Sequence, residues 1–234
     1  MGRMIGSSSI SFDKPPFIIE GASIVGRKEG DGPLGKLFDV VEQDPMLGQE
    51  TWEEAESLLQ KEAIQKLLFK AGMSKEEIRY IFGGDLLGQL IATTFGILEF
   101  EVPFFGLYGA CSTMGEALSL GAVMVEAGNA DNVIAMASSH FASAERQFRF
   151  PLAYGNQRPY AATWTVTGCG AVIISTKKGF AKITGITTGK IVDFGVKDAQ
   201  NMGACMAPAA ADVIYQHFKD FNSPPGSLGK NHNG

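Results

Sequence analysis

The clearest indication of the fold class of this chain is the segment PFFGLYGACSTM, Pro103–Met114. An apolar run that ends in glycine passes through a tight turn at Cys111 and enters a helical pattern that continues to about residue 127. A buried strand that leads straight into a helix is the basic junction of an α/β protein. We therefore predict that Cys111 and Ser112 lie where a strand ends and a helix begins.

The start of this helix is a candidate site. The first N–H groups of a helix have no partner within it, and the helix dipole is positive there. The turn therefore favours a thiolate at Cys111 and can hold a carboxylate or an oxyanion. Cys111 is a candidate nucleophile, and Cys111 and Ser112 are candidate ligand-binding residues. The alternative is that Cys111 is a small residue packed in a tight turn, because buried cysteine is common.

Four further apolar runs predict buried strands that alternate with helices. A capping-box pattern, Thr51 with Glu54, opens the longest helix, and Gly72 ends it. The alternation predicts an α/β fold with a mostly parallel sheet and helices on both faces. The segment Gly30–Asp44 is rich in glycine and aspartate and is expected to be a loop. The four runs are residues 17–26, 80–84, 132–137 and 168–175.

The composition is that of an acidic globular protein. The 234 residues carry a formal net charge of −5 and 45% of them are hydrophobic. No run of lysine and arginine is present, so the chain is not expected to bind nucleic acid, because neutralising phosphates needs clustered cations. Three widely spaced cysteines favour neither a zinc site nor a disulfide framework. The sequence shows no signal peptide and no stretch of the ~20 apolar residues that a membrane helix needs, which predicts a soluble protein of cytoplasmic origin.

Asp85 and His140 follow the ends of two predicted strands, where the sites of α/β sheets gather. A thiol nucleophile needs a base, so His140 is a candidate catalytic and ligand-binding residue. A structural role is the alternative for His140. Asp85 either caps the next helix, which is its default role, or takes part in a pocket as a ligand-binding residue.

The segment from residue 145 to residue 160 places three arginines, Arg146, Arg149 and Arg158, among four aromatic rings. Arginine binds carboxylates through two parallel hydrogen bonds, and aromatic rings stack on planar ligands. A small aromatic diacid would fit this set, which makes the arginines candidate ligand-binding residues. The alternative is a loop in which arginine stems pack over the rings at a subunit interface.

Several segments together resemble a known family. Gly109–Ser112 sits where condensing enzymes and thiolases of the thiolase superfamily carry their nucleophilic cysteine. The other segments look like the stage V sporulation protein AD family of endospore-forming bacteria, and the resemblance runs from about residue 17 to residue 221. These segments are Gly32–Gly35, Leu37–Asp39, Gly84–Leu87, Ser138–His140, Ala144–Arg149, Thr165–Gly168 and Met206–Asp212.

The resemblance implies a thiolase-like fold of two related α/β halves and a homodimer. It also implies a sporulation protein that binds dipicolinic acid, alone or as its calcium chelate. Such a protein is the soluble part of a membrane transport assembly that moves the acid into the developing spore. The expected partners are the membrane proteins of that assembly, and the expected location is peripheral to the spore inner membrane. No cofactor and no resident metal are expected.

The alternative function is that of an acyl-CoA condensing enzyme or thiolase, an acyltransferase with Cys111 as its nucleophile and CoA as its carrier. In enzymes of this superfamily the cysteine works with His, Asn or Cys residues of the second half, which we expect to be truncated in this chain. A thiol without a base has no proton acceptor, whereas helix N–H groups and arginines can still bind a dianion. Binding is therefore expected in preference to catalysis.

Four regions are expected along the chain. An N-terminal segment covers residues 1–16, and a complete thiolase-like half covers residues 17–180. Residues 181–221, with a strand at 182–187 and a helix at 203–218, begin a second half, and residues 222–234 form an irregular tail. An incomplete half leaves an unpaired sheet edge, which predicts a lower stability than that of a longer relative.

Overall fold

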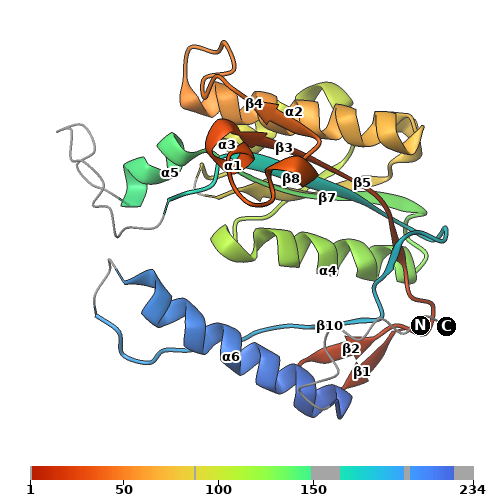
Figure 1. The fold of residues 1–234 in the computed structure, drawn as a ribbon. Coiled ribbons are helices and arrows are strands. Elements are labelled where there is room, and N and C mark those ends of the chain that lie inside the picture. Colours follow the sequence, from red (N-terminus) through yellow and green to blue (C-terminus); the bar gives the residue numbers. More distant parts are fainter. Residues whose placement is uncertain (1, 87, 149–163, 198–200, 224–234) are drawn as a thin grey trace. The chain divides into compact units, whose positions relative to one another are not determined.

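The computed structural model describes residues 2–86, 88–148, 164–197 and 201–223, with the backbone alone for residues 145–148. These residues divide into two compact units (Figure 1). The larger unit is continuous, from Pro16 to Lys182. The smaller unit combines Met1–Pro15 with Ile183–Gly234.

The larger unit is built on a seven-stranded mixed sheet. Its strands are β3 (Phe17–Gly26), β4 (Val40–Glu42), β5 (Tyr80–Asp85), β6 (Phe104–Gly106), β7 (Asn132–Ser139), β8 (Gly168–Ser175) and β9 (Ala181–Lys182). They lie in the order β4-β3-β8-β7-β5-β6, and β9 pairs with β3. Strands β3, β4, β5, β6 and β7 run in one direction, and β8 runs against them because it pairs antiparallel with both β3 and β7. The predicted α/β fold with a mostly parallel sheet is confirmed.

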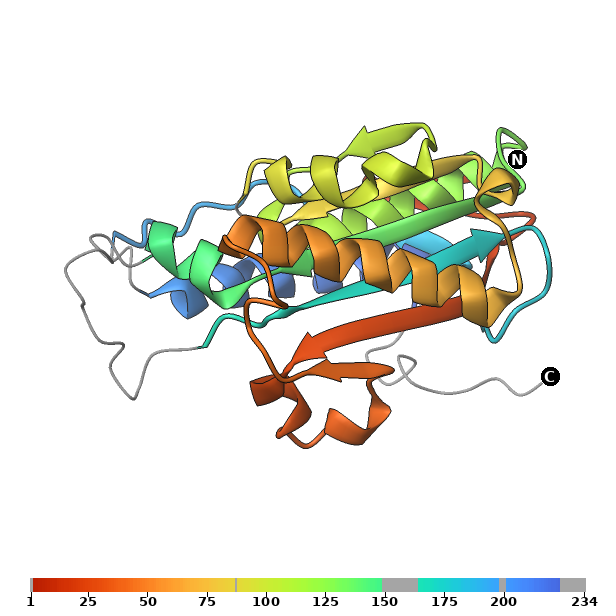
Figure 2. The same ribbon diagram turned by 90° about the horizontal axis from the view of Figure 1, so that it is seen from above.

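Helices cover both faces of this sheet (Figures 1 and 2). They are α1 (Arg27–Gly30), α2 (Trp52–Ala71), α3 (Ile91–Ile97), α4 (Thr113–Glu126) and α5 (Phe141–Phe148), with short 3-10 turns η1 (Gly35–Leu37), η2 (Lys75–Glu77), η3 (Leu98–Phe100) and η4 (Ala110–Ser112). Helix α2 packs on β3 and β8 from one side, and α4 packs on β5 and β7 from the other. Along β7, Met136 belongs to the core beneath α2. Its near neighbour Val133 faces α4, where a Cβ added to Gly121 would lie 3.1 Å from the Val133 side chain.

Helix α2 begins and ends as its sequence predicts. The N–H of Glu54 donates to Thr51 Oγ1 at 3.2 Å, and the N–H of Thr51 donates to the Glu54 carboxylate at 3.0 Å, which completes the capping box. Gly72 follows the helix with φ of 61°, a left-handed conformation that favours glycine. Local sequence therefore defines both ends of the longest helix of this unit.

Two local predictions are wrong. The segment Gly30–Asp44 is not only a loop, because it contains η1 and the strand β4, which pairs with β3. The single strand predicted at 182–187 is two strands of different sheets: β9 pairs with β3, and β10 (Gly185–Thr187) pairs with β2 (Ser9–Ser11). Strands of two or three residues are defined by their pairing partner, which a sequence pattern does not show.

The smaller unit has a three-stranded antiparallel sheet in the order β1-β2-β10, with β1 spanning Arg3–Ile5. Helix α6 (Met202–Phe221) packs on β2 and β10, which confirms the helix predicted at residues 203–218. Near its end, Asp220 accepts hydrogen bonds from the Ser8 N–H at 3.1 Å and the Ser9 hydroxyl at 2.8 Å. A Cβ at Gly6 would lie 1.9 Å from Asp220 Oδ1, and φ there is 56°, so this turn requires glycine.

The division of the chain into four regions stays a prediction. The described residues of the ranges 2–15 and 183–223 form one compact unit. The reason is the pairing of β2 with β10. Within the described part of the chain, no helix combines the length and the apolar character needed to cross a bilayer.

Candidate functional site

The junction at Cys111 is formed, and the cysteine lies on the surface. Strand β6 ends at Gly106, the turn η4 follows, and α4 begins at Thr113. Ala110 has φ of 49°, a left-handed conformation that costs an ordinary residue about 1 kcal/mol. The backbone turns sharply there, immediately before the exposed Cys111. The structure therefore shows the tight strand-to-helix turn that the sequence predicts. Cys111 is not packed in the interior.

The start of α4 already holds a carboxylate. Ser112 Oγ lies 2.8 Å from the carbonyl oxygen of Gly109 and also forms a hydrogen bond with Glu116, which is in the first turn of α4. The N–H of Gly109 donates to Thr113 Oγ1 at 3.3 Å. A carboxylate in the first turn offsets the positive end of the helix dipole. An anionic ligand at this turn would compete with Glu116.

His140 is fully buried, and both of its ring nitrogens have backbone partners. The N–H of Ala142 donates to Nδ1 at 3.2 Å, so the ring proton is on Nε2, which donates to the carbonyl oxygen of Pro45 at 2.8 Å. Burial lowers the pKa of the imidazole below its usual value. The neutral ring therefore has no unoccupied nitrogen to accept a proton from Cys111, and the geometry supports the structural role.

Asp85 is also fully buried, and it organises the backbone that follows β5. Its Oδ1 accepts from the N–H of Leu90 at 3.2 Å. Its Oδ2 accepts from the N–H of Thr93 at 3.2 Å and from the Thr93 hydroxyl at 2.8 Å. These bonds fix the loop and the first turn of α3. The default capping role of Asp85 fits this geometry.

Strand pairing places these three predicted residues near the carboxyl ends of neighbouring strands. Asp85 pairs with Ser138 in the β5–β7 register, and β6 pairs with β5 on its other side. Asp85 is the last residue of β5, and His140 and Cys111 follow the carboxyl ends of the adjacent parallel strands β7 and β6. In the described part of the chain, no hydrogen bond joins Cys111 to either of the other two.

A buried polar network that the sequence did not predict extends from Asp85 into α2. Gln60 Nε2 donates to Thr93 Oγ1 at 3.0 Å and to Ser138 Oγ at 2.6 Å. The Ser138 hydroxyl donates to Glu56 Oε1 at 2.7 Å. The Ser143 hydroxyl donates to Glu56 Oε2 at 3.0 Å, which ties α5 to α2. The buried network consists of Glu56, Gln60, Asp85, Thr93 and Ser138, together with the half-buried Ser143.

Glu56 is an unusual member of the buried network because its side chain is ionisable and only 1% exposed. Burial raises its pKa to about 7, although the hydroxyls of Ser138 and Ser143 lower it; the Asp85 carboxylate adds to the increase. Burial therefore favours the neutral form of Glu56 far more than it is favoured in an exposed glutamate. A signal was present in the sequence: Glu56 and Gln60 are four residues apart on the face of α2 that carries Leu59 and Ala63.

A second feature that the sequence analysis missed is a cavity of about 500 Å³ beyond the carboxyl end of β3, called here the β3-end cavity. Arg27 and Lys28 of α1 contribute cations, and Phe141 and Trp164 contribute rings. The remaining lining residues are Gly26, Glu29, Asp31, Gln43, Pro45 and Thr167. The cavity combines the two chemistries, cations and rings, that the sequence analysis assigned to residues 145–160.

The candidate ligand residues Arg146, Arg149 and Arg158 lie outside the residues whose side chains the structure describes. Their role stays a prediction. Of the other cysteines, Cys205 is exposed and Cys169 is buried, and burial raises the pKa of the Cys169 thiol. Within the described ranges, no group of three or more His, Cys, Asp or Glu side chains is arranged to hold a metal ion.

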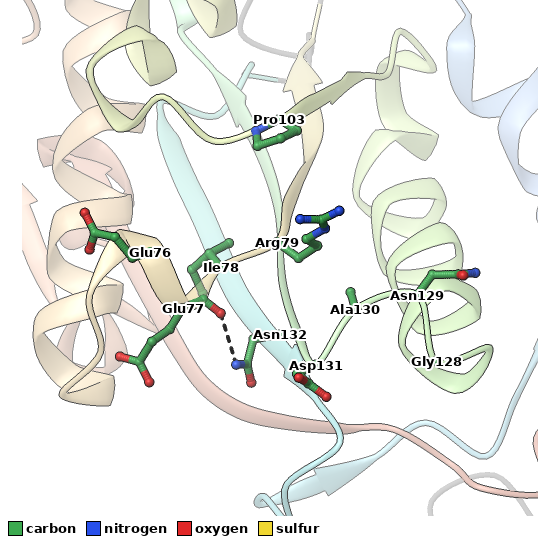
Figure 3. Close-up of a pocket in the computed structure, with 10 residues that line it drawn as sticks. All are labelled: Glu76, Glu77, Ile78, Arg79, Pro103, Gly128, Asn129, Ala130, Asp131 and Asn132. Atoms are coloured by element: carbon green, nitrogen blue, oxygen red, sulfur yellow. Dashed lines mark hydrogen bonds between the residues drawn. The ribbon is translucent and has the colours of Figure 1, made fainter.

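Another cavity, of about 600 Å³, lies at the amino ends of β5 and β7, opposite the strand ends described above (Figure 3). Figure 3 shows the carboxylates of Glu76 and Glu77 on one side and the guanidinium of Arg79 on the other. Glu77 is used locally: its carboxylate accepts from the Ser74 N–H at 2.9 Å, and its carbonyl oxygen accepts from Asn132 Nδ2 at 3.1 Å. The charged groups of this cavity do not converge, so we do not regard it as a candidate site.

Comparison with known proteins gives a family match over nearly the whole chain. Residues 6–228 match the family model described as Stage V sporulation protein AD. The chain is 43% identical over 220 residues to Stage V sporulation protein AD of Bacillus subtilis (strain 168). The alignment covers 94% of this chain but 65% of that relative, so the chain spans less than two thirds of its length.

Solved structures of condensing enzymes share the fold. The 3-oxoacyl-(acyl carrier protein) synthase III of Xanthomonas oryzae pv. oryzae is 14% identical, with a TM-score of 0.51 over 94% of this chain and 75% of the enzyme. An OleA variant of Xanthomonas campestris is 12% identical, with a TM-score of 0.51 over 95% of this chain and 74% of OleA. At such low identity these likenesses show a thiolase-like fold alone.

Proposed function

This chain belongs to the stage V sporulation protein AD family, and we propose that it binds dipicolinic acid, alone or as its calcium chelate. In this proposal the chain serves a membrane transport assembly that moves the acid into the developing spore. The membrane proteins of that assembly are its partners, and it lies peripherally at the spore inner membrane. The family match supports the sporulation role, and the chemistry of the site supports binding.

One observation carries the preference for binding over catalysis, namely the state of His140. Its Nδ1 accepts from a backbone N–H and its Nε2 donates to the carbonyl oxygen of Pro45, so neither nitrogen is available as a base. A thiol nucleophile needs a proton acceptor, whereas binding of a planar diacid needs only cations, N–H groups and rings. Binding remains feasible with the groups that the described residues provide.

Calorimetric titration of the purified chain with dipicolinate, with and without calcium, tests the proposal. We expect saturable heat. Isophthalate is the matched control ligand, because it has the same two carboxylates on a six-membered ring but lacks the ring nitrogen that completes a calcium chelate. A sample that melts cooperatively and gives no heat at millimolar dipicolinate in either condition would rule out the proposed function for this chain.

The second candidate function is acyl transfer through Cys111, and the exposure of this thiol at the sharp turn before α4 favours it. In that case, incubation with an acyl-CoA should leave an acyl group on the protein that mass spectrometry detects. The adduct should be absent in Cys111→Ala and present in Cys205→Ala, the matched control at the other exposed cysteine. No adduct on folded protein would end this candidate.

We also propose that the chain forms a homodimer through β6. This strand is the last in the sheet and pairs with β5 on one side, so its other backbone edge has no strand partner in the described larger unit. Phe105 of β6 is 45% exposed and the following Tyr108 is 51% exposed, which adds apolar surface to that edge. Light scattering measures the mass in solution, and a monomer at all accessible concentrations would contradict this proposal.

A further inference from the structure

The hydrogen bonds around Glu56 fit a neutral carboxylic acid. Ser138 Oγ accepts from Gln60 Nε2 at 2.6 Å and donates its own proton to Glu56 Oε1 at 2.7 Å. Ser143 Oγ lies 3.0 Å from Glu56 Oε2 and 3.0 Å from the carbonyl oxygen of His140, and its single proton can serve only one of these acceptors. When Glu56 carries a proton on Oε2, that proton is donated to Ser143 Oγ, and the Ser143 hydroxyl donates to His140. The neutral form therefore satisfies both hydroxyls and both carboxyl oxygens.

Ionisation of Glu56 is unfavourable at this position. The Ser143 hydroxyl must then turn from the carbonyl oxygen of His140 to the carboxylate, which has two hydroxyl donors while its side chain is 1% exposed. An ionised carboxylate can accept about four hydrogen bonds, so two hydroxyls replace only part of its hydration. Burial raises the pKa of Glu56 to about 7, although the two hydroxyls lower it.

The titratable groups around Glu56 do not compensate its charge. Asp85 of β5 and Glu53 of α2 are acids, and their carboxylates favour the neutral form of Glu56. Burial, and then the Glu56 carboxylate, raise the pKa of the Cys169 thiol on β8, so this thiol stays neutral. Burial lowers the pKa of the His140 imidazole below its usual value, which keeps this ring neutral as well. The ionised form therefore gains no attraction from these four groups.

Helix α5 is the element beside Glu56 that can open most easily. Strand β7, which carries Ser138, is fixed within the sheet because it pairs with β5 on one side and β8 on the other. Helix α5 lies toward one end of the sheet (Figures 1 and 2). Of its four side chains that the structure describes, the buried ones are the methyl groups of Ala142 and Ala144. A methyl group buries little apolar area, so little burial is lost when this helix opens.

The opening begins after the first two residues of α5. The N–H of Phe141 donates to Thr167 Oγ1 at 3.0 Å, and the N–H of Ala142 donates to His140 Nδ1 at 3.2 Å. These bonds hold the first two residues of α5 and do not involve α2. The next residue, Ser143, makes the hydrogen bond to α2. A change in that bond therefore acts on α5 from Ser143 onward.

We propose that Glu56 and Ser143 form a pH-dependent tie between α2 and α5. Neutral Glu56 holds α5 on α2, and when Glu56 loses its proton α5 opens more often from Ser143 onward, so that water reaches the carboxylate. The folded pKa of about 7 exceeds the ordinary value of 4.5. The tie is therefore at full strength below pH 4.5 and is lost as pH rises through about 7. The backbone of Arg146, a predicted ligand residue, lies in the part of α5 that opens, but the pH dependence does not rest on the proposed function.

Hydrogen exchange of backbone amides tests the proposal on the purified chain without any ligand. Peptides that cover α5 and β8 report the protection of each element, after correction for the pH dependence of the intrinsic exchange rate. A carboxylate with a pKa of 4.5 in the opened state and about 7 in the closed state should open α5 about tenfold more often at pH 8 than at pH 6. The corrected protection of α5 should fall by that factor. It should stay below the protection of β8, because α5 opens without the sheet.

The variant Glu56→Gln reproduces the neutral acid, since its amide oxygen accepts from Ser138 and its N–H donates to Ser143 Oγ. The corrected protection of α5 in this variant should change less than about twofold between pH 6 and pH 8, because no proton is lost. Glu50→Gln, at an exposed glutamate just before α2, is the matched control and should show the tenfold fall of the parent protein.

A fall in α5 protection that the parent protein and Glu50→Gln show and Glu56→Gln lacks supports the inference. Equal falls in the parent protein and Glu56→Gln overturn it. Equal protection of α5 and β8 at every pH also overturns it, because α5 would then open only together with the sheet. The parent protein decides the matter even if Glu56→Gln does not fold: α5 protection that is the same at pH 6 and pH 8, or absent at pH 6, overturns the tie.

Discussion

The ends of three neighbouring strands use their polar residues in opposite ways. After β6, Cys111 and Ser112 lie on the surface at the start of α4. After β5 and β7, Asp85 and His140 are fully buried, and their side-chain hydrogen bonds hold backbone and hydroxyl groups of the fold. All four residues lie at or after the carboxyl ends of parallel strands. Position at a strand end therefore does not by itself separate a binding residue from a structural one.

The two groups of residues differ in burial and in whether water can replace a lost hydrogen-bond partner. A buried donor or acceptor that loses its partner costs about 1–3 kcal/mol, whereas an exposed group regains water. Substitutions in the buried network and at His140 should therefore change stability, and substitutions at the exposed turn should change reactivity alone. Four measurements test this contrast, in order of decreasing expected change.

Asp85→Ala should lower the free energy of unfolding by about 3 kcal/mol, because it leaves the N–H groups of Leu90 and Thr93 and the Thr93 hydroxyl without their acceptor. Urea denaturation measures this change. Asp131→Ala, at an exposed aspartate of the same unit, is the matched control and should cost less than about 0.5 kcal/mol. Equal midpoints for the two variants would contradict the capping role.

Glu56 should make stability depend on pH, with a sign that follows from its raised pKa. The folded pKa of about 7 exceeds the ordinary value of 4.5, so the folded state binds the proton more tightly. The stabilisation is fully present below pH 4.5 and is lost as pH rises through about 7, with a total loss of about 3 kcal/mol. Glu56→Gln cannot ionise and should therefore gain stability relative to the parent protein between these limits.

Denaturation of Glu56→Gln and of the parent protein across this pH window gives the difference directly. Subtraction cancels the contribution of His140, which has the opposite sign because burial lowers its pKa. Glu50→Gln, at an exposed glutamate just before α2, is the control and should follow the parent curve. A difference between Glu56→Gln and the parent protein that does not vary with pH would show that Glu56 does not titrate in this window.

His140→Ala should cost about 2 kcal/mol of the free energy of unfolding, because it removes a buried ring and leaves the N–H of Ala142 without its acceptor. It should leave the reactivity of Cys111 unchanged. The rate of Cys111 alkylation against pH measures this, in a Cys205→Ser background that leaves Cys111 as the exposed thiol among the three cysteines. A displaced pH profile in His140→Ala would show that the imidazole and the thiol interact.

Cys111→Ala should have the smallest effect on stability, less than about 0.5 kcal/mol, because the side chain is exposed. Native alkylation should modify Cys111 and Cys205, whereas Cys169 should react only after unfolding, since it is buried and burial raises the pKa of its thiol. Thermal melts and mass spectrometry measure the two effects. A loss above about 1 kcal/mol would place Cys111 with the structural residues instead.

Local pattern was sufficient for much of the fold. The capping box of Thr51 and Glu54, the glycine that ends α2 and the strands β3 and β8 all follow from neighbouring residues. The antiparallel direction of β8 could not be predicted, because an apolar run does not show which strands it will pair with. Glu56 escaped notice for a related reason: only the contacts of Ser138 and Ser143 show that a glutamate on the apolar face of α2 is hydrogen-bonded rather than solvated.

Short segments of sequence were enough to predict the α/β class, the strand-to-helix junction at Cys111 and the family resemblance, since each depends on residues that are close together in the chain. The hydrogen bond between His140 and the carbonyl oxygen of Pro45 and the position of Lys28 over Trp164 became evident from the packed fold. Burial and hydrogen-bond satisfaction depend on partners that are distant in sequence. Those partners meet only when the strands have paired and the helices have packed.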